Sequence, residues 1–457
     1  MRLLLIKLIP LGKLKRLLFI ALFMQSLLFP VGEAGGILLL IQPGAESAGG
    51  TGGIVARTDN SLMSYYNPSG LAFLTKSHVS LSHTQNVWFW WREGTYNFLS
   101  FSHPLNEMTA IGGNVSNLYS DMTHIRSDEA GNYSYYSDKL EYLTITLNYS
   151  RMLSSSSSIG FGLKLLRLKQ DFPGSSASST PPWTENNALF DLGYLKKFKA
   201  LDFGVSILNI GDKISFIDPA QTDPPPINLR AGISSVFYND IGSLRFSFDI
   251  QKLLVGSYAD MDWDGDGYIG RYDENGHYNG SGDYNSDGQI ETVHTDEWYV
   301  GLFTSWVDDW FLRGDRDIPT RGQSDGIIGG YAWDDKDGDG VVDLEDDEIV
   351  SAGFNEGFNF NDSEWGIYNE EGIKEVGNRH NRSIQDEIDK LRYNSGIEYE
   401  YKHFVFRYGY YYDKEGKTEH SSYGLGYNYK GFHIDYAQID REYQMEKTQY
   451  FSLSYEF

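Results

Sequence analysis

The C-terminal stretch Gln449-Tyr450-Phe451-Ser452-Leu453-Ser454-Tyr455-Glu456-Phe457 decides the fold of this chain. Every second residue from 451 onward is apolar, which is the pattern of a β-strand with one apolar face. A soluble protein that ended on an apolar edge strand would tend to aggregate. An outer-membrane barrel, in contrast, needs a closing strand whose outward face meets lipid and whose inward face is polar. The stretch therefore predicts a transmembrane β-barrel whose outward face carries Phe451, Leu453, Tyr455 and Phe457.

Thirteen other segments of the 457-residue chain alternate in the same way. We therefore predict an all-β protein, a 14-stranded antiparallel transmembrane β-barrel. The predicted inward faces consist mainly of Ser, Thr, Asn, Gly, Asp and Arg. The fourteen predicted strands are residues 77–83, 95–103, 108–115, 141–151, 158–169, 188–195, 200–208, 227–236, 243–253, 393–401, 404–412, 421–429, 432–439 and 449–457.

The connections between the predicted strands alternate in length. Those after even-numbered strands are short, and those after odd-numbered strands are mostly longer, such as 84–94, 116–140 and 256–390. Outer-membrane barrels have short periplasmic turns and long external loops. The alternation therefore places residues 256–390 outside the cell. This holds if residues 297–306, which could form a further, rival strand within that segment, do not add a fifteenth strand to the barrel.

The N-terminal residues 1–34 have the pattern of a secretory signal. A basic region precedes an apolar core at residues 17–29, and Gly32-Glu33-Ala34 supplies small residues for cleavage. The alternative is an N-terminal membrane anchor. We expect residues 35–76 to form a periplasmic or plug segment, with barrel strands in residues 77–255 and 391–457.

The negative charge of the chain is concentrated in one segment. The net charge is −25, and residues 256–390 hold 34 Asp/Glu and 9 Lys/Arg, so the rest of the chain is neutral. Without a basic face a nucleic-acid partner is not expected. No cysteine is present and no nucleophile, zinc or phosphate-loop motif occurs, so we expect no enzyme activity.

Three stretches of this acidic segment have the spacing of calcium loops. Ca²⁺ takes six to eight oxygen ligands, with carboxylates at positions 1, 3 and 5, a backbone carbonyl at 7, a turn glycine at 6 and an acidic residue at 12. The stretches resemble the loops of EF-hands, dockerins and thrombospondin-type repeats, although position 12 is Asp or His and the flanks are not helical. We expect calcium to order this segment; the alternative is a solvated acidic loop. The predicted ligands are Asp262, Asp264, Asp266, Tyr268 and Asp273; Asp283, Asn285, Asp287 and Gln289 in a weaker copy; and Asp335, Asp337, Asp339, Val341 and Asp346.

An aromatic cluster, Trp88-Phe89-Trp90-Trp91, follows the first predicted strand. Aromatic side chains gather at the interfaces of membrane barrels, so we interpret the cluster as part of the interfacial girdle. A docking patch for a partner is the alternative, because exposed aromatic residues make good anchors.

The segment before the first strand carries the motif Asn67-Pro68-Ser69-Gly70-Leu71-Ala72. Together with residues 423–437 near the end of the chain, it resembles the PorV/PorQ family, FadL-like fourteen-stranded barrels of the type IX secretion system. The Asn-Pro-x-Gly element also occurs in fatty-acid transporters of the FadL type. The resemblance gives Asn67, Pro68, Gly70 and Leu71 as family motif residues. The terminal strand, ending on Phe457, resembles the assembly signal of outer-membrane barrels in general.

The resemblance implies a non-enzymatic barrel in the outer membrane of a Gram-negative bacterium. Such a barrel would contact lipid and would bind or shuttle secreted cargo proteins with other type IX secretion components. An alternative is a FadL-like channel for hydrophobic small molecules, with residues 35–74 as a plug in the lumen. A surface adhesin displayed on a barrel is a third hypothesis.

Overall fold

The computed structural model describes residues 36–50, 54–89, 92–127, 133–171, 183–215, 222–255, 390–414, 418–441 and 447–457. Within the acidic segment and just after it, it describes residues 257–258, 294–295, 297–306, 331–334, 348–352, 373–375 and 388.

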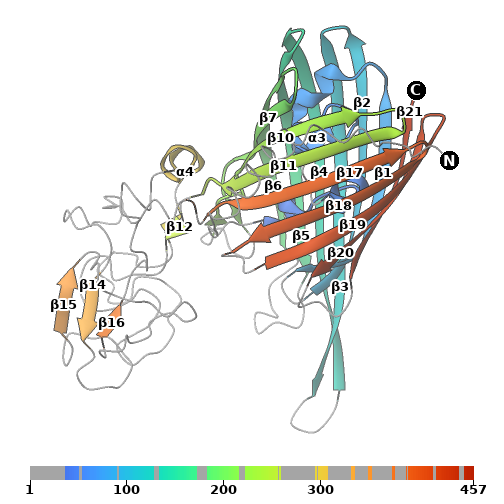
Figure 1. Ribbon diagram of the computed structural model, residues 1–457. Helices are drawn as coiled ribbons and strands as arrows, with labels where there is room; N and C mark the ends of the chain where they lie inside the picture. The colour runs from blue at the N-terminus through green and yellow to red at the C-terminus, as the bar shows by residue number, and fades with distance from the viewer. Residues whose placement is uncertain are drawn as a thin grey trace, which may run out of the picture.

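Fourteen strands form one closed barrel in which neighbouring strands are antiparallel (Figure 1). This confirms the predicted all-β antiparallel barrel and its strand count. The strands are β1 (His78–Phe89), β2 (Arg92–Asn106), β3 (Thr109–Ser127), β4 (Tyr133–Ser154), β5 (Ser157–Asp171), β6 (Trp183–Lys197), β7 (Asp202–Gly211), β10 (Asn228–Tyr238), β11 (Gly242–Leu253), β17 (Arg392–Tyr401), β18 (Phe404–Asp413), β19 (Thr418–Tyr429), β20 (Phe432–Arg441) and β21 (Thr448–Glu456).

The C-terminal strand closes the barrel. β21 pairs with β1 from His78↔Glu456 to Gln85↔Gln449 and with β20 on its other side. Phe451 and Leu453 point outward and are exposed, whereas Tyr450 points into the lumen and is buried. The terminal stretch thus lies in the closing position that its alternation predicts.

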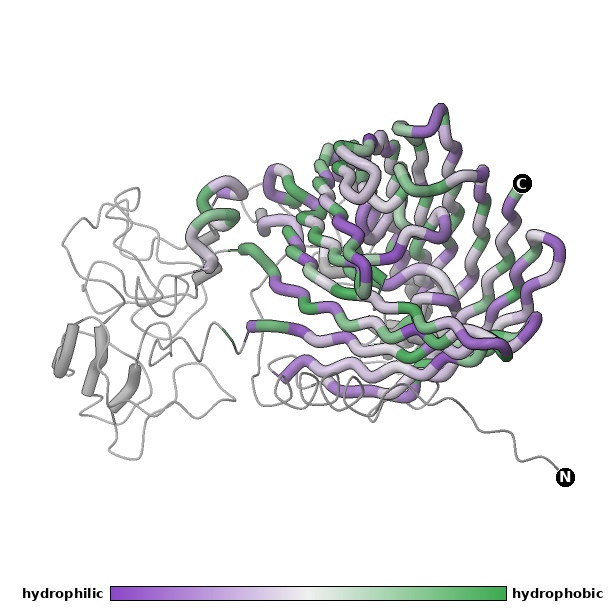
Figure 2. Tube along the Cα trace, turned by 45° about the horizontal axis from the view of Figure 1, so that its top comes forward, coloured by the Kyte–Doolittle hydropathy of each residue, from purple (hydrophilic) through white to green (hydrophobic). Residues whose placement is uncertain are grey.

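The outer surface of the barrel is apolar. Leu81, Leu147 and Ile434 are each more than half exposed, and Phe404, Phe406, Tyr408 and Tyr410 form an outward row on β18. Figure 2 shows the resulting alternation of apolar and polar residues along the strands. A soluble protein rarely exposes so large an apolar area, and this surface is suited to lipid.

The two ends of the barrel differ, and we name them by their connections. The turn end carries short hairpins, such as Lys402-His403 between β17 and β18, and the loop end carries the longer connections. Two predicted loops were wrong. Most of residues 84–94 and 116–140 belong to β1, β2, β3 and β4, which continue past the ends of their shorter neighbours.

The lumen contains the N-terminal segment, described at residues 36–50 and 54–74. It forms the 3₁₀ helix η1 (Ile37–Leu40), the helices α2 (Ala45–Gly49) and α3 (Met63–Tyr66), and the 3₁₀ helix η2 (Pro68–Phe73). α2 contacts β18 to β21, whereas η2 contacts β2 to β6 on the opposite side. Most of the segment's side chains are buried, so it occupies the lumen as a plug.

The acidic segment contributes small elements. These are β12 (Ser257–Tyr258), β13 (His294–Thr295), α4 (Trp298–Thr304), and a sheet of β14 (Tyr331–Asp334), β15 (Glu348–Ala352) and β16 (Ile373–Glu375). Residues 297–306, the rival strand, contain the helix α4, so they add nothing to the barrel count. The two-residue strands β8 (Ile214–Ser215) and β9 (Thr222–Asp223) pair with each other beyond β7. No helix among the described residues is long and apolar enough to cross a membrane.

Candidate functional site: the plugged lumen

Asn67 is the main docking residue of the plug. It precedes η2, and its Oδ1 accepts hydrogen bonds from the backbone N–H of Ser69 at 3.2 Å and from the Ser69 hydroxyl at 2.6 Å. Its Nδ2 donates to the carbonyl of Val55 at 2.9 Å and to that of Tyr194 on β6 at 3.2 Å. The side chain therefore caps η2 and ties two parts of the plug to the barrel wall.

Glycines on the inner wall allow this close contact. A Cβ atom on Gly193 would lie 2.2 Å from Asn67 Oδ1, and one on Gly160 would lie 2.3 Å from the Ser69 nitrogen. Both distances are far below van der Waals contact, so larger residues at these positions would displace the plug. The predicted motif residues Asn67, Pro68, Gly70 and Leu71 are all buried at this contact.

Buried side chains of the wall complete the docking. The Asp249 carboxylate accepts hydrogen bonds from the backbone N–H groups of Ile54 at 2.8 Å and Val55 at 3.1 Å. The Ser206 hydroxyl donates to the carbonyl of Tyr66 at 2.8 Å. These bonds satisfy backbone groups of the plug that would otherwise be buried without partners.

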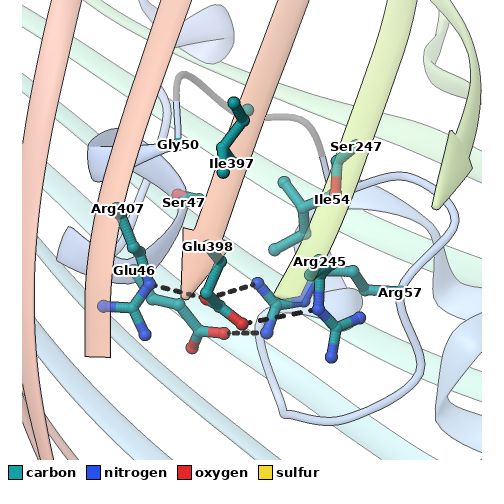
Figure 3. Close-up of a pocket in the computed structure, with 11 residues that line it drawn as sticks. Glu46, Ser47, Gly50, Ile54, Arg57, Arg245, Ser247, Ile397, Glu398 and Arg407 are labelled. Atoms are coloured by element: carbon teal, nitrogen blue, oxygen red, sulfur yellow. Dashed lines mark hydrogen bonds and ion pairs between the residues drawn. The ribbon is translucent and has the colours of Figure 1, made fainter. Parts of the chain in front are cut away.

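A cluster of seven charged groups joins the other side of the plug to the wall. We call it the ionic cluster: Glu46, Arg57 and Asp59 come from the plug, and Arg245, Glu398, Arg407 and Asp435 come from β11, β17, β18 and β20. Glu398 lies at its centre (Figure 3), 2.7 Å from Arg407, 3.3 Å from Arg57 and 3.4 Å from Arg245. Arg57 also contacts Glu46 at 2.5 Å, and Arg245 contacts Asp59 at 2.7 Å.

The ionic cluster lies at the turn end of the lumen. The four strands that carry its wall residues reach the turn end at Gly242 (β11), Tyr401 (β17), Phe404 (β18) and Phe432 (β20). In each strand the charged wall residue is the fourth residue counted from that end. Burial tends to raise the pKa of Asp59, but Arg57 and Arg245 outweigh it and hold the pKa below its usual range. Three guanidinium groups against four carboxylates thus form a nearly neutral network that holds the plug at this end. A cavity of about 20 Å³ remains between them, which is room for about one water molecule.

An apolar chamber lies nearer the loop end of the lumen. Leu39 of η1 and Tyr65 of α3 form its plug side. Its free volume is about 10 Å³. The apolar wall residues of the chamber and of the buried cluster around it are Tyr96, Phe98, Leu118, Leu140, Tyr142, Leu166, Leu168 and Leu189.

A few polar groups lie at the edge of this chamber. Lys164 contacts Asp191 at 3.1 Å and donates to the side chain of Asn209. Arg230 lies over the rings of Tyr65 and Tyr66, 5.6 and 5.1 Å from their centroids. Among the described residues the Tyr142 hydroxyl finds no hydrogen-bond partner, although the residue is only 3% exposed. An apolar cavity with a few convergent polar groups is the usual form of a small-molecule site.

The prediction of mainly polar inward faces was wrong in this half of the lumen. On β5 the outward residues change from Phe161, Leu163 and Leu165 to Arg167, while the inward residues change from glycine and Lys164 to leucine. The same inversion occurs on β4. Toward the loop end, the outward residue changes from Leu143 to Glu141, and the inward residue changes from Thr144 to Tyr142. The strands leave the lipid at this level, so the phase inversion is the sequence signal that could have revealed the chamber.

Other predicted residues fall wholly or partly outside the described part of the chain. The calcium-ligand candidates, residues 262–289 and 335–346, lie outside the described residues, as do residues 1–34. Trp88 and Phe89 belong to β1, but the side chains of the aromatic cluster are likewise outside the description.

Comparison with solved structures finds other barrels at low identity. The toluene transporter TbuX of Ralstonia pickettii has a TM-score of 0.46 and 12% identity, covering 91% of this chain and 98% of its own. The monoaromatic hydrocarbon channel CymD has the same TM-score and identity, covering 92% and 98%. A FadL homologue of Pseudomonas aeruginosa has a TM-score of 0.41 and 11% identity, covering 94% and 99%. No family model and no curated protein matches the chain.

Proposed function

We propose that this protein is an outer-membrane channel for small hydrophobic molecules and that its N-terminal segment closes the channel at rest. The observation that carries the proposal is the apolar chamber. A structural barrel or a water-filled pore has no need of inward-facing aromatic and leucine side chains above the level of the lipid. A site for hydrophobic substrates does need them.

The plug explains how such a channel stays closed. The chamber has room for about one water molecule, so a substrate must displace Leu39 and η1 before it can bind. The single hydroxyl proton of Tyr65 is shared between the carbonyls of Leu39, at 2.6 Å, and Ile41, at 2.9 Å, which holds this part of the plug in place. Movement at η1 would open the chamber while the Asn67 contacts keep the rest of the plug docked.

The polar edge of the chamber favours substrates with an apolar body and at most one polar group. Lys164 and the Tyr142 hydroxyl, which has no partner among the described residues, could donate to such a group. Two of the structural neighbours are a toluene transporter and a monoaromatic hydrocarbon channel. We therefore choose a monoaromatic probe.

Crystals of the protein soaked with 4-bromotoluene test the proposal. The bromine should give an anomalous peak in the chamber next to Leu118 and Tyr142. The variant Leu118→Trp should abolish the peak, and Tyr119→Trp, whose side chain points outward on the same strand, should keep it. Peaks confined to the detergent around the barrel would overturn the proposal.

The cargo shuttle of the PorV/PorQ type is the second candidate. It is supported by the residues around Asn67 and by the size of residues 256–390, which would face the outside of the cell. In that case deletion of residues 256–390 would leave a folded barrel but change the secretion and surface display of cargo. Unchanged display would count against the shuttle and leave the channel proposal untouched.

A further inference from the structure

The helix α4 (Trp298–Thr304) packs on the outside of the barrel. Its residues Trp298 and Leu302 pack against a buried apolar cluster formed by Ile210, Ile227 and Leu254, and the partly buried Ile207 and Leu229 pack against the same cluster. An ion pair between Glu297 and Lys213 at 3.3 Å holds the start of the helix near the end of β7. A part of the acidic segment thus returns to the barrel beside the end of β7.

The side of the wall follows from the burial pattern. Ile207 and Leu229 are direct partners in the pairing of β7 with β10. Both lie between buried, inward-facing residues, so both point outward. This outward face is the one that contacts lipid elsewhere on the barrel, which means that α4 covers a patch of the lipid-facing surface.

The level of the helix follows from the strand lengths. β7 has 10 residues and β10 has 11, the length that a tilted strand needs to cross a bilayer. Leu229 is the second residue of β10 at its loop end. α4 therefore lies at the height where the loop end of the barrel meets the membrane surface.

The face of α4 next to the one that packs on the wall is aromatic and exposed. Tyr299 is 52% exposed, Phe303 75% and Trp306, just after the helix, 40%. Trp298 and Leu302 lie about 100° around the helix from Tyr299 and Phe303. A short helix that is apolar on both faces is suited to a site between a protein wall and lipid, and Tyr and Trp are the residues favoured at membrane interfaces.

We propose that the exposed face of α4 inserts into the outer leaflet and anchors the acidic segment to the membrane beside the barrel. The occupant is lipid because the face continues the lipid-facing surface at the membrane level. The helix then has two roles: its Trp298 face holds the wall, and its Phe303 face holds the bilayer. The inference rests on the location of the barrel in a membrane, but it does not depend on what the lumen carries.

The absence of cysteine from the chain permits a direct test. The full protein carrying Phe303→Cys is labelled with a fluorophore at residue 303 and reconstituted in phosphatidylcholine vesicles. Some of the lipid carries a nitroxide near the headgroup end of its acyl chain, and this nitroxide quenches a fluorophore that lies in the membrane. Leu147→Cys on the lipid-facing wall is the positive control, and Glu107→Cys in the β2–β3 turn is the negative control. Migration of the unheated barrel on gels checks that each variant folds, and Tyr299→Cys replaces Phe303→Cys if the latter does not.

The expected result is quenching at residue 303 several-fold above that at residue 107 and close to that of residue 147. Quenching at residue 303 equal to that at residue 107 would overturn the proposed anchor. The same holds if the cause is protein that covers the label in place of lipid. Loss of quenching at residue 147 would show that the barrel itself is outside the bilayer. This control therefore distinguishes a wrong membrane location from a wrong anchor.

Discussion

The side chain of Asn67 lies directly against Gly193 on β6, where a Cβ atom would come within 2.2 Å of its Oδ1. Asn67 has little room to move, because its amide makes four hydrogen bonds to the plug and the wall. The glycine and the asparagine are therefore one structural unit, although 126 positions separate them. The motif before the first strand gains a physical role from this contact.

Gly193→Ala should loosen the plug without unfolding the barrel. The added methyl group must push Asn67 away, and overpacking of this kind costs about 1–3 kcal/mol. Limited proteolysis of the folded protein should then cut within residues 54–74 faster than in the parent. Gly50→Ala is the control, because its Cβ would have no neighbour closer than 3.8 Å. Equal cleavage of both variants would contradict the docking role of Gly193.

Glu398→Gln should weaken the hold of the plug at the turn end. The change leaves Arg57, Arg245 and Arg407 without their shared carboxylate, and loss of one partner from a buried ion pair costs about 3–5 kcal/mol. The current through single barrels in planar bilayers should show more frequent open events. Glu400→Gln removes a carboxylate two residues further along β17 that accepts a hydrogen bond from the neutral Ser243, and it should leave the current unchanged.

Tyr65→Phe should release η1 from its resting position. The variant loses the one donor that the carbonyls of Leu39 and Ile41 share, and leaving these buried acceptors without it costs about 1–3 kcal/mol. Hydrogen exchange of residues 37–41 should accelerate by roughly 5- to 100-fold. Tyr142→Phe makes the same chemical change in the same chamber, but its hydroxyl has no partner among the described residues, so exchange should not change. If the two variants behaved alike, Tyr65 would not hold η1.

Calcium should bind the full-length protein through the acidic segment. Titration calorimetry should give dissociation constants on the order of 10⁻⁴–10⁻³ M, typical of extracellular calcium modules. Replacement of Asp262, Asp266, Asp335 and Asp339 by Asn should remove most of the heat. No heat at millimolar calcium in the parent protein would sink the calcium prediction, and it would leave the barrel and its lumen unaffected.

The strands could be predicted from the sequence because lipid imposes a strict alternation on them. The row Phe404, Phe406, Tyr408 and Tyr410 shows this rule directly, since a polar residue on the lipid side costs free energy. The plug could not be placed in the same way. Its contacts with Gly160, Gly193 and Asp249 join residues far apart in the chain, and a single sequence contains no pattern that pairs them.

The chamber was missed for a more specific reason. The predicted strands stopped at residue 115 and began again at 141, so Leu118 and Leu140 were assigned to a loop. The structure continues both strands beyond the lipid, and there the rule reverses, with polar residues outside and apolar residues inside. A search for the reversal itself, as at Leu165-Leu166-Arg167-Leu168, would find the chamber from the sequence.

Uptake of radiolabelled toluene tests the central claim most directly. The protein is produced in a Gram-negative host that lacks channels of this kind. Toluene uptake is then compared for the parent chain and two variants: Leu118→Asp, which changes the chamber, and Tyr119→Asp, which changes the outward face of the same strand. The channel account predicts uptake above that of the empty host for the parent and for Tyr119→Asp, and uptake near the empty-host level for Leu118→Asp. Equal uptake by the empty host and the parent, with folded barrel present in the outer membrane, would contradict it.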